Sequence, residues 1–241
     1  MEQDVLGEFL GTFVLILFGT GFGLSNNLNK TYARAVGVSW LSITISWGLA
    51  VTLGVYVALA LGAPAHLNPA LSLGGVLMGN MAFDKALLYT GVQIVGAFLG
   101  ASLASLAFWP HFAATKPSEG NTVGNFATGA AISHPSFNLI GEIIATFAFV
   151  LPVQYMTRPG IINPELLPIA LGLLVMAVGL AFGSMTGYAI NPARDIGPRL
   201  AYSLLPLPNK EPNSGNWGYV WVPICGPIIG ALLAMIVGKL F

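Results

Sequence analysis

The side chains of this sequence best placed for chemistry are two asparagines, Asn68 and Asn191, each followed by Pro and Ala. The two Asn-Pro-Ala triplets lie 123 residues apart, one in each half of the chain. Asparagine is a favoured N-cap, and proline fits the first turn of a helix because it has no N–H group to lose there. Each triplet therefore predicts the start of a short helix with an amide at its positive end.

Paired helix N-termini that carry amide donors are suited to the recognition of neutral hydrogen-bond acceptors. If the two ends meet, Asn68 and Asn191 can donate to the oxygen of water or of a hydroxyl group. The two helix dipoles would oppose cations, including a hydrated proton. Arg194 follows the second triplet and would add donors and positive charge at the same place; the alternative for this residue is extension to a membrane surface.

The composition indicates where this chemistry takes place. The chain has 241 residues, of which 55% are hydrophobic and 7% are charged, and its mean hydropathy is +0.78. Because a soluble domain carries about 25% charged residues, we expect an integral membrane protein. The net charge of zero gives no reason to expect a nucleic acid. The sequence has no nucleotide-binding glycine motif and no metal-ligating cluster, so we expect no cofactor, no metal and no enzymatic activity.

Six apolar stretches are long enough to cross a bilayer, which takes about 20 residues. They cover residues 5–24, 36–61, 86–108, 137–155, 166–182 and 220–240. The segments that begin with the triplets, 68–78 and 191–205, are too short to span and are expected to be re-entrant. Irregular backbone at membrane depth is tolerated only beside protein or water, so these two segments should line a cavity.

The two halves of the sequence also resemble each other. Residues 7–12 (GEFLGT) match residues 141–146 (GEIIAT) at an offset of 134, and residues 48–50 match residues 179–181 (both GLA). Each half holds three spans, an odd number, so the second half should be inserted upside down relative to the first. We expect a single channel domain that covers the whole chain, 1–241. Its parts are a first repeat 1–109 with a re-entrant loop 64–79, a connecting loop 110–136, and a second repeat 137–241 with a re-entrant loop 186–205.

Two carboxylates, Glu8 and Glu142, occupy equivalent positions in the repeats. One interpretation is a proton relay, which would make the chain a proton-coupled secondary transporter. The simpler interpretation is that each carboxylate accepts hydrogen bonds from a re-entrant loop, whose N–H groups need partners. A structural junction protein with a closed pore is a third class. Passive flux, gradient-driven flux or no flux through reconstituted protein distinguishes the three.

Three further side chains need an assignment, namely Trp47 on the second span, Tyr188 three residues before Asn191, and His66 two residues before Asn68. Trp47 and Tyr188 can form an apolar wedge that packs the carbon skeleton of a solute; the alternative is packing against lipid or the protein core. His66 is expected to be a structural loop residue, because no other histidine, cysteine or carboxylate clusters with it.

Over nearly its whole length the sequence resembles the aquaporin, or major intrinsic protein, family. The resemblance rests on the two triplets, on Arg194 after the second of them, and on the paired glutamates. Within the family the chain looks like the glycerol-facilitator branch, which has Asp after the pore Arg, a basic residue four positions on, and Pro with an aliphatic residue in the sixth helix. Here these are Asp195, Arg199 and Pro223-Ile224, and Asp195 and Arg199 form an i,i+4 pair that would brace the short helix.

The resemblance implies the aquaporin fold, an all-α membrane protein with six transmembrane helices and two re-entrant half-helices in an inverted 3+3 repeat. It implies a pore midplane at Asn68 and Asn191. The selectivity filter that it implies is matched by Trp47, Gly179, Tyr188 and Arg194. The pore-lining backbone carbonyls are matched by Pro64, Ala65, His66, Gly187, Tyr188 and Ala189. The structural supports are matched by Glu8, Glu142, Asp195 and Arg199.

The implied function is a passive channel for glycerol and related polyols and for water, with undissociated lactic acid as a further substrate and with ions and protons excluded. Gly179 would leave room for a solute wider than water. Tyr188 stands where the best-known glycerol channels have Phe and adds a hydroxyl to the apolar side. The family forms homotetramers in the cell membrane with both termini in the cytoplasm. The loop charges weakly favour the opposite orientation, and we follow the family.

Overall fold

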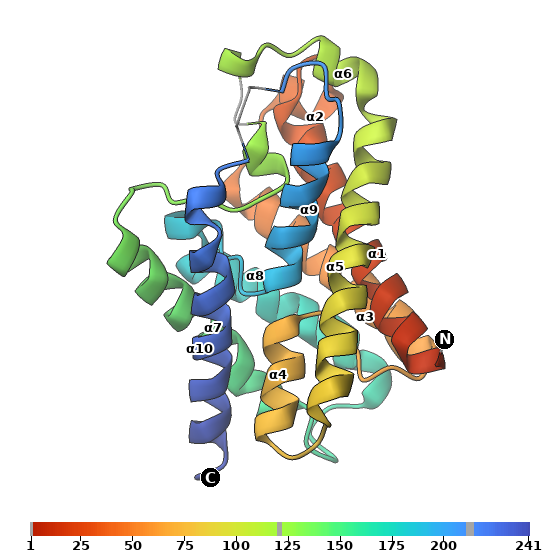
Figure 1. Ribbon diagram of the computed structural model, residues 1–241, viewed down its shortest axis with the longest axis vertical. Coiled ribbons are helices and arrows are strands. Elements are labelled where there is room, and N and C mark those ends of the chain that lie inside the picture. Colours follow the sequence, from red (N-terminus) through yellow and green to blue (C-terminus); the bar gives the residue numbers. More distant parts are fainter. Residues whose placement is uncertain (1, 120–121, 211–214) are drawn as a thin grey trace.

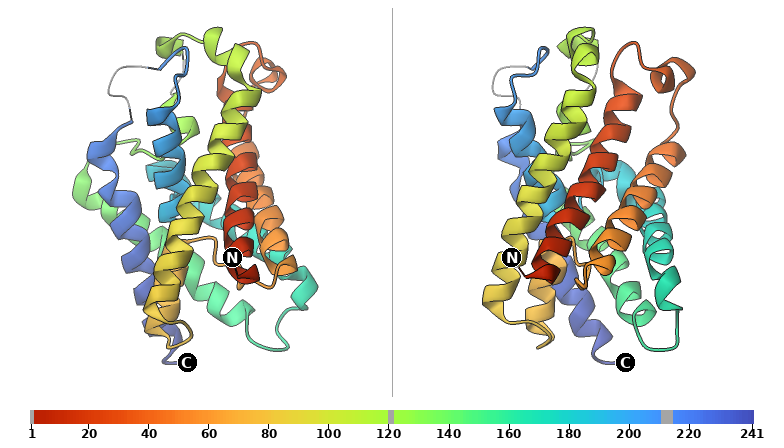
Figure 2. Two further views of the ribbon diagram at one scale, coloured as in Figure 1. Left: turned by 45° about the vertical axis from the view of Figure 1, so that its right-hand side comes forward. Right: turned by 90° about the vertical axis from the view of Figure 1, so that its right-hand side faces the viewer.

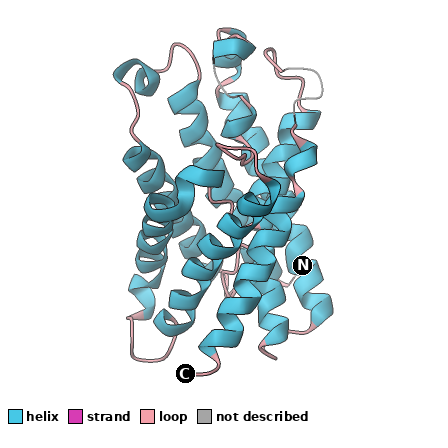
Figure 3. Ribbon diagram, turned by 90° about the vertical axis from the view of Figure 1, so that its left-hand side faces the viewer, coloured by secondary structure: helices cyan, strands magenta, loops and turns pink. Residues whose placement is uncertain are grey.

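The computed structural model describes residues 2–119, 122–210 and 215–241, and these residues form helices and loops without any strand (Figure 3). Six of the helices are long and apolar enough to cross a membrane, which confirms the six spans expected from the sequence. They form one bundle (Figure 1) and comprise α1 (Gln3–Asn27), α3 (Trp40–Ala60), α5 (Phe83–Ala107), α7 (Pro135–Met156), α8 (Leu167–Thr186) and α10 (Trp221–Gly238).

Two short helices begin at the two triplets, α4 (Pro69–Leu77) and α9 (Pro192–Leu204). In Figure 1, α4 lies in the lower half of the bundle and α9 in the upper half, so each crosses only part of its thickness. In both helices the asparagine is the N-cap and the proline is the first helical residue, as the sequence predicts.

Some connections differ from the sequence-based boundaries. The second span was expected from residue 36, but α3 begins at Trp40, with Ser39 as its N-cap. The reason is Gly37, whose φ of +82° ends the short helix α2 (Tyr32–Val36) and turns the chain. The connecting segment also contains short helical pieces. They are α6 (Trp109–Ala113), η1 (Pro117–Glu119) and η2 (Val123–Asn125). Elsewhere in the chain, η3 (Pro164–Leu166) precedes α8 and η4 (Trp217–Tyr219) precedes α10. Residues 120 and 121 of the expected connecting loop lie outside the described residues.

The two repeats pack in the same way. Helix α1 packs against α3 and α5, and α7 packs against α8 and α10, while α3 and α8 join the repeats. The α1–α5 and α7–α10 pairs approach closely at equivalent glycines. A Cβ atom at Gly96 would lie 2.4 Å from the carbonyl oxygen of Phe9, and one at Gly230 would lie 2.4 Å from that of Ile143. Only glycine fits these helix crossings.

Each short helix also packs against a long helix of the opposite repeat, α4 against α10 and α9 against α5. The views of Figure 2 show both chain termini in the lower half of the bundle, opposite to α2 and α6. The repeats are therefore interlocked at the centre.

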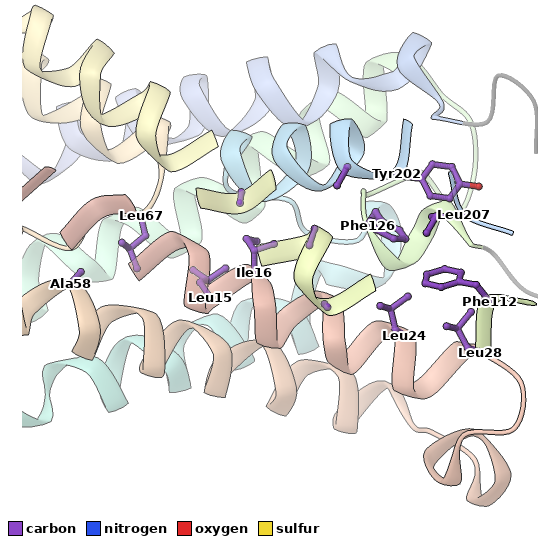
Figure 4. Close-up of a cluster of buried hydrophobic side chains, with 14 of the residues drawn as sticks. Leu15, Ile16, Leu24, Leu28, Ala58, Leu67, Phe112, Phe126, Tyr202 and Leu207 are labelled. Atoms are coloured by element: carbon purple, nitrogen blue, oxygen red, sulfur yellow. The ribbon is translucent and has the colours of Figure 1, made fainter. Parts of the chain in front are cut away.

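Two buried apolar clusters fill the bundle. One continues to the end of the molecule that carries α6. There Leu24 of α1 and Leu28, the C-cap of that helix, meet the aromatic rings of Phe112, Phe126 and Tyr202 (Figure 4). This cluster anchors the connecting segment onto α1 and α9, and so positions the part of that segment that reaches the candidate site.

Candidate pore and constriction

The two triplets meet at the centre of the molecule. The side-chain amide of Asn68 donates from Nδ2 to the carbonyl oxygen of Ile190 at 2.8 Å, and that of Asn191 donates to the carbonyl oxygen of Leu67 at 2.7 Å. Each asparagine thus bonds to the residue that precedes the other asparagine. An amide has two N–H donors, so each side chain keeps a second donor.

The helix caps fix which way these amides point. Asn68 Oδ1 accepts from the N–H of Ala70 at 2.9 Å. Asn191 Oδ1 accepts from Ala193 at 3.0 Å and from Arg194 at 3.3 Å. Because the oxygen of each amide faces its own helix, the nitrogen faces the opposite loop. The meeting point is therefore rich in donors.

The loops before the asparagines share an unusual backbone. Ala65 and Leu67 have φ angles of +57° and +50°, and Tyr188 and Ile190 have φ angles of +36° and +44°. These two pairs are 123 residues apart, like the asparagines. A non-glycine residue in the left-handed region costs on the order of 1–3 kcal/mol, so other contacts must hold this conformation.

In the first repeat the holding contacts come from Glu8, whose side chain is fully buried. Its two oxygens accept from the backbone N–H groups of His66 and Leu67, each at 2.7 Å. Gln93 donates to Glu8 at 2.9 Å and to the hydroxyl of Ser72 at 3.1 Å. The ring nitrogen Nδ1 of His66 lies 3.2 Å from the same hydroxyl. The His66 ring is thus tied to the loop's own polar network.

Glu142 holds the second loop in the same way, and its side chain is also buried. Its oxygens accept from the backbone N–H groups of Ala189 at 2.9 Å and Ile190 at 3.0 Å. The hydroxyl of Thr186 donates to it at 2.6 Å. Both carboxylates therefore bond to the two N–H groups that precede an asparagine, which is the arrangement the simpler interpretation of the sequence expects.

Two cavities adjoin the residues of this site. The large cavity, of about 890 Å³, extends from the Lys85 end of the bundle past Asn68 and Asn191. The small cavity, of about 480 Å³, opens on the side of the connecting segment. The loop residues expected to line the pore divide between them. The large cavity is lined by Pro64, Ala65, His66, Tyr188 and Ala189, and the small cavity by Gly187 and again Tyr188.

Three residues, Trp47, Tyr188 and Arg194, line both cavities, so the two cavities meet at them. The guanidinium carbon of Arg194 lies 3.9 Å from the centroid of the Trp47 ring, a cation–π contact. Nη1 of Arg194 donates to the carbonyl oxygen of Phe126 at 3.2 Å. One polar and two aromatic side chains thus surround this constriction.

Gly179, the fourth predicted filter residue, lies behind the ring of Tyr188. A Cβ atom at Gly179 would lie 2.8 Å from Cζ of Tyr188 and 2.9 Å from the methyl carbon of Thr44. Gly183 leaves similar room for the other edge of the ring, and Trp40 meets the ring edge-on at 6.1 Å. Gly179 therefore shapes the constriction by letting Tyr188 fold back against α8.

The hydroxyl of Tyr188 is buried and has no hydrogen-bond partner in the described part of the chain. Gly179 leaves room for the aromatic ring of Tyr188. No described residue forms a hydrogen bond with the hydroxyl that distinguishes Tyr from Phe.

Asp195 and Arg199 form a fully buried, bidentate ion pair on α9, with Nε–Oδ1 and Nη2–Oδ2 distances of 2.8 and 3.0 Å. The pair does more than brace its own helix. Asp195 accepts from the backbone N–H and the hydroxyl of Thr128, both at 2.7 Å. Arg199 donates to the carbonyl oxygens of Thr128, Gly215 and Asn216. It thereby holds two loops beside the small cavity.

The sequence alone does not single out several residues that hold this site, among them Ser72, Gln93, Phe126, Thr128 and Thr186. Gln93 is missed because its counterpart at the offset of 134 is Pro227, so the repeat gives no signal there. Phe126 and Thr128 lie in the connecting segment, which belongs to neither repeat. Ser72 could have been found, because it is the counterpart of Asp195 at the offset of 123.

The chain is similar to known proteins over almost all of its length. It is 49% identical over 230 residues, 95% of each chain, to the glycerol uptake facilitator protein 2 of Lactiplantibacillus plantarum. It is 44% identical over 245 residues, 100% of each chain, to the glycerol uptake facilitator protein of Streptococcus pneumoniae. Its fold matches the X-ray structure of the aquaglyceroporin from Plasmodium falciparum with a TM-score of 0.82 at 28% identity, covering 97% of this chain and 93% of that one.

The fold expected from the sequence is thus confirmed, with six spanning helices and two re-entrant half-helices. The model of the family described as major intrinsic protein matches residues 1–237. This chain is a multi-pass membrane protein and belongs to the major intrinsic protein family.

Proposed function

We propose that the chain is a passive channel for small uncharged solutes, namely glycerol and related polyols together with water. The observation that carries this proposal is the reciprocal bonding of Asn68 and Asn191, which leaves an amide donor of each at the point where two helix N-termini meet. A neutral oxygen acceptor can bond there, while a cation meets the positive ends of two helix dipoles. The names of the relatives support glycerol as a substrate.

The constriction has a shape that suits a polyol. Trp47 and Tyr188 form an apolar side and Arg194 a polar side, and glycerol carries C–H groups along one edge and hydroxyl groups along the other. Hydroxyls that lose water can bond to Arg194 and to loop carbonyls. A cation is repelled by Arg194 and by the two helix N-termini, and an anion would have to shed its hydration against the apolar side.

Undissociated lactic acid is a further substrate in this proposal. The neutral acid carries a hydroxyl and a carboxyl group on a short carbon skeleton, much like a polyol. The lactate anion would have to shed its hydration at the apolar side of the constriction. Uptake should therefore follow the protonated fraction of the acid as the pH falls.

Glu8 and Glu142 act as braces for the re-entrant loops rather than as a proton relay. Both oxygens of each carboxylate already accept backbone N–H groups of a loop. Neither carboxylate forms a salt bridge with Lys or Arg in the described residues. Nothing in this arrangement favours the proton-coupled alternative.

In the proposed arrangement residues 1–241 form one channel domain, and four identical chains assemble in the cell membrane, each with its own pore. Both termini face the cytoplasm. The large cavity then opens to the cytoplasm and the small cavity, with its Arg194 constriction, opens to the outside. Both termini lie in the same half of the bundle (Figure 2), as an arrangement with both termini on one side of the membrane requires.

Stopped-flow light scattering on proteoliposomes tests the proposal, with empty liposomes as the control. Glycerol and water should equilibrate faster with the protein than without it, and a pH or sodium gradient should not change the rate. Lactic acid uptake should rise as the pH falls. A single-channel current, or uptake that tracks the lactate anion, would contradict the proposal.

A further inference from the structure

A glycine on α1 lies directly behind the indole of Trp47. A Cβ atom at Gly19 would lie 2.3 Å from Cζ3, 2.5 Å from Cη2 and 2.9 Å from Cε3 of Trp47. All three of its nearest neighbours thus belong to this one ring. The Trp47 ring rests against the bare backbone of α1.

The indole also contacts Arg194, whose guanidinium carbon is 3.9 Å from the ring centroid. The ring therefore contacts both the backbone of α1 and the polar side of the constriction. An ordinary contact is at least 3.4 Å, so a Cβ atom at Gly19 would require the ring to move by about 1 Å. That movement is away from α1, and because the ring lines both cavities it changes the shape of the passage where they meet. Close-packed surroundings transmit such a shift rather than absorb it.

We propose that Gly19 is a positioning residue that sets the width of the constriction through Trp47. Its lack of a side chain lets the indole lie back against α1, as Gly179 and Gly183 let Tyr188 lie back against α8. Both aromatic walls of the constriction are then placed by glycines behind them. The inference rests on the proposed function, because it concerns which neutral solutes pass. A solute with a carbon skeleton depends on this width more than water does.

The test compares Gly19→Ala with Gly21→Ala. Gly21 lies two residues further along the same helix, and a Cβ atom there would meet nothing within 4 Å. Both changes alter the helix propensity of α1 alike. They differ in that only Gly19→Ala places a methyl group against Trp47. The ratio of glycerol to water permeability should fall about tenfold in Gly19→Ala and stay at the wild-type value in Gly21→Ala.

A second pair of variants isolates the contact with the ring. Trp47→Phe removes the outer ring atoms that the new methyl group would meet. In the Trp47→Phe background, Gly19→Ala should therefore change the permeability ratio less than about twofold. The four proteins form a double-mutant cycle, and the difference between the two effects of Gly19→Ala measures its coupling to Trp47. A purely structural effect of Gly19→Ala on α1 would persist in this background.

The outcomes separate the inference from the proposed function. Wild-type protein that passes no glycerol contradicts the proposed function and the inference with it. Wild-type protein that passes glycerol, with Gly19→Ala equal to Gly21→Ala, overturns the inference alone. If Gly19→Ala does not fold, the double variant Gly19→Ala/Trp47→Phe should fold. Failure of both shows that the methyl group meets more than Trp47 and overturns the inference.

Discussion

The two re-entrant segments have almost the same backbone and very different side chains. In both, a buried glutamate holds two loop N–H groups, an asparagine caps the short helix, and left-handed residues precede it at the same spacing. At the offset of 123, however, His66 is replaced by Ala189, Leu71 by Arg194 and Ser72 by Asp195. The shared residues hold the two loops. The unshared residues of the second repeat, Arg194 and Asp195, lie at the constriction and behind it, whereas His66 and Ser72 belong to the polar network of the first loop.

The difference is also one of charge. Helix α4 has no charged residue, whereas α9 carries Arg194 at the constriction and the buried pair Asp195–Arg199 behind it. The pair connects α9 to the connecting segment and to the loop before α10. The charged side chains at the constriction and behind it thus come from the second repeat alone. The variants below test this division from the largest expected effect to the smallest.

Loss of either glutamate should be the most damaging change, and equally so in both repeats. Glu8→Ala and Glu142→Ala each leave two backbone N–H groups and one side-chain donor without an acceptor, at about 1–3 kcal/mol for each group. The yield of folded protein should fall sharply, as measured by size-exclusion chromatography and thermal unfolding. Glu→Gln keeps an acceptor for one of the two N–H groups but turns an NH2 group toward the other, so it should be less damaging than Glu→Ala and keep part of the flux. Normal yield with an altered pH dependence of uptake would favour proton coupling instead.

The counterparts Asp195 and Ser72 should behave unequally. Asp195→Ala leaves Arg199 as a buried charge without its partner, which costs about 3–5 kcal/mol. Ser72→Ala removes a neutral hydroxyl and should cost about 1 kcal/mol. Thermal unfolding of the two variants measures the difference. Similar losses at both positions would show that charge does not distinguish the half-helices.

Gly179→His sharpens the comparison at the constriction itself. A side chain at Gly179 must displace the Tyr188 ring, so glycerol permeability should fall about tenfold more than water permeability. Gly48 is its counterpart in the first repeat, and a Cβ atom there would meet the carbonyl oxygen of Gly172 at 2.6 Å instead. Gly48→Ala should lower the yield and leave the permeability ratio unchanged. Unchanged glycerol permeation in well-folded Gly179→His would place the constriction elsewhere.

Tyr188→Phe should have the smallest effect on stability. The buried hydroxyl has no partner among the described residues, so its removal should change the free energy of unfolding by less than about 1 kcal/mol and in the stabilising direction. Comparison of the melting temperatures of wild type and variant measures this. A clear loss of stability would mean that the hydroxyl is bonded in the membrane-embedded protein, for example to water.

The sequence predicts those features that follow a local rule or occur twice. The spans follow from hydropathy, the starts of α4 and α9 from Asn and Pro, and the positions of Glu8 and Glu142 from the repeat. The contact of Trp47 with Arg194 and the bond from Arg194 to Phe126 could not be derived. They join segments far apart in the chain, and their geometry depends on how whole helices pack.

The start of the second span shows a different limit. Hydropathy continues through residues 36–38, but Gly37 adopts a backbone conformation that ends one helix before the next begins. Apolar character alone does not reveal such a turn.

The interlocking of the repeats has a consequence for how the chain is assembled. Asn68 lies in the first third of the sequence, but it bonds to Ile190, and α4 packs against α10 at the end of the chain. During synthesis the first re-entrant segment can meet its own brace, Glu8, long before these other partners exist. Contacts of such sequence separation form slowly because a long loop must close first. The hydrogen bonds at the centre of the molecule can therefore form only after the second re-entrant segment has been made, and α4 is fully packed only after α10.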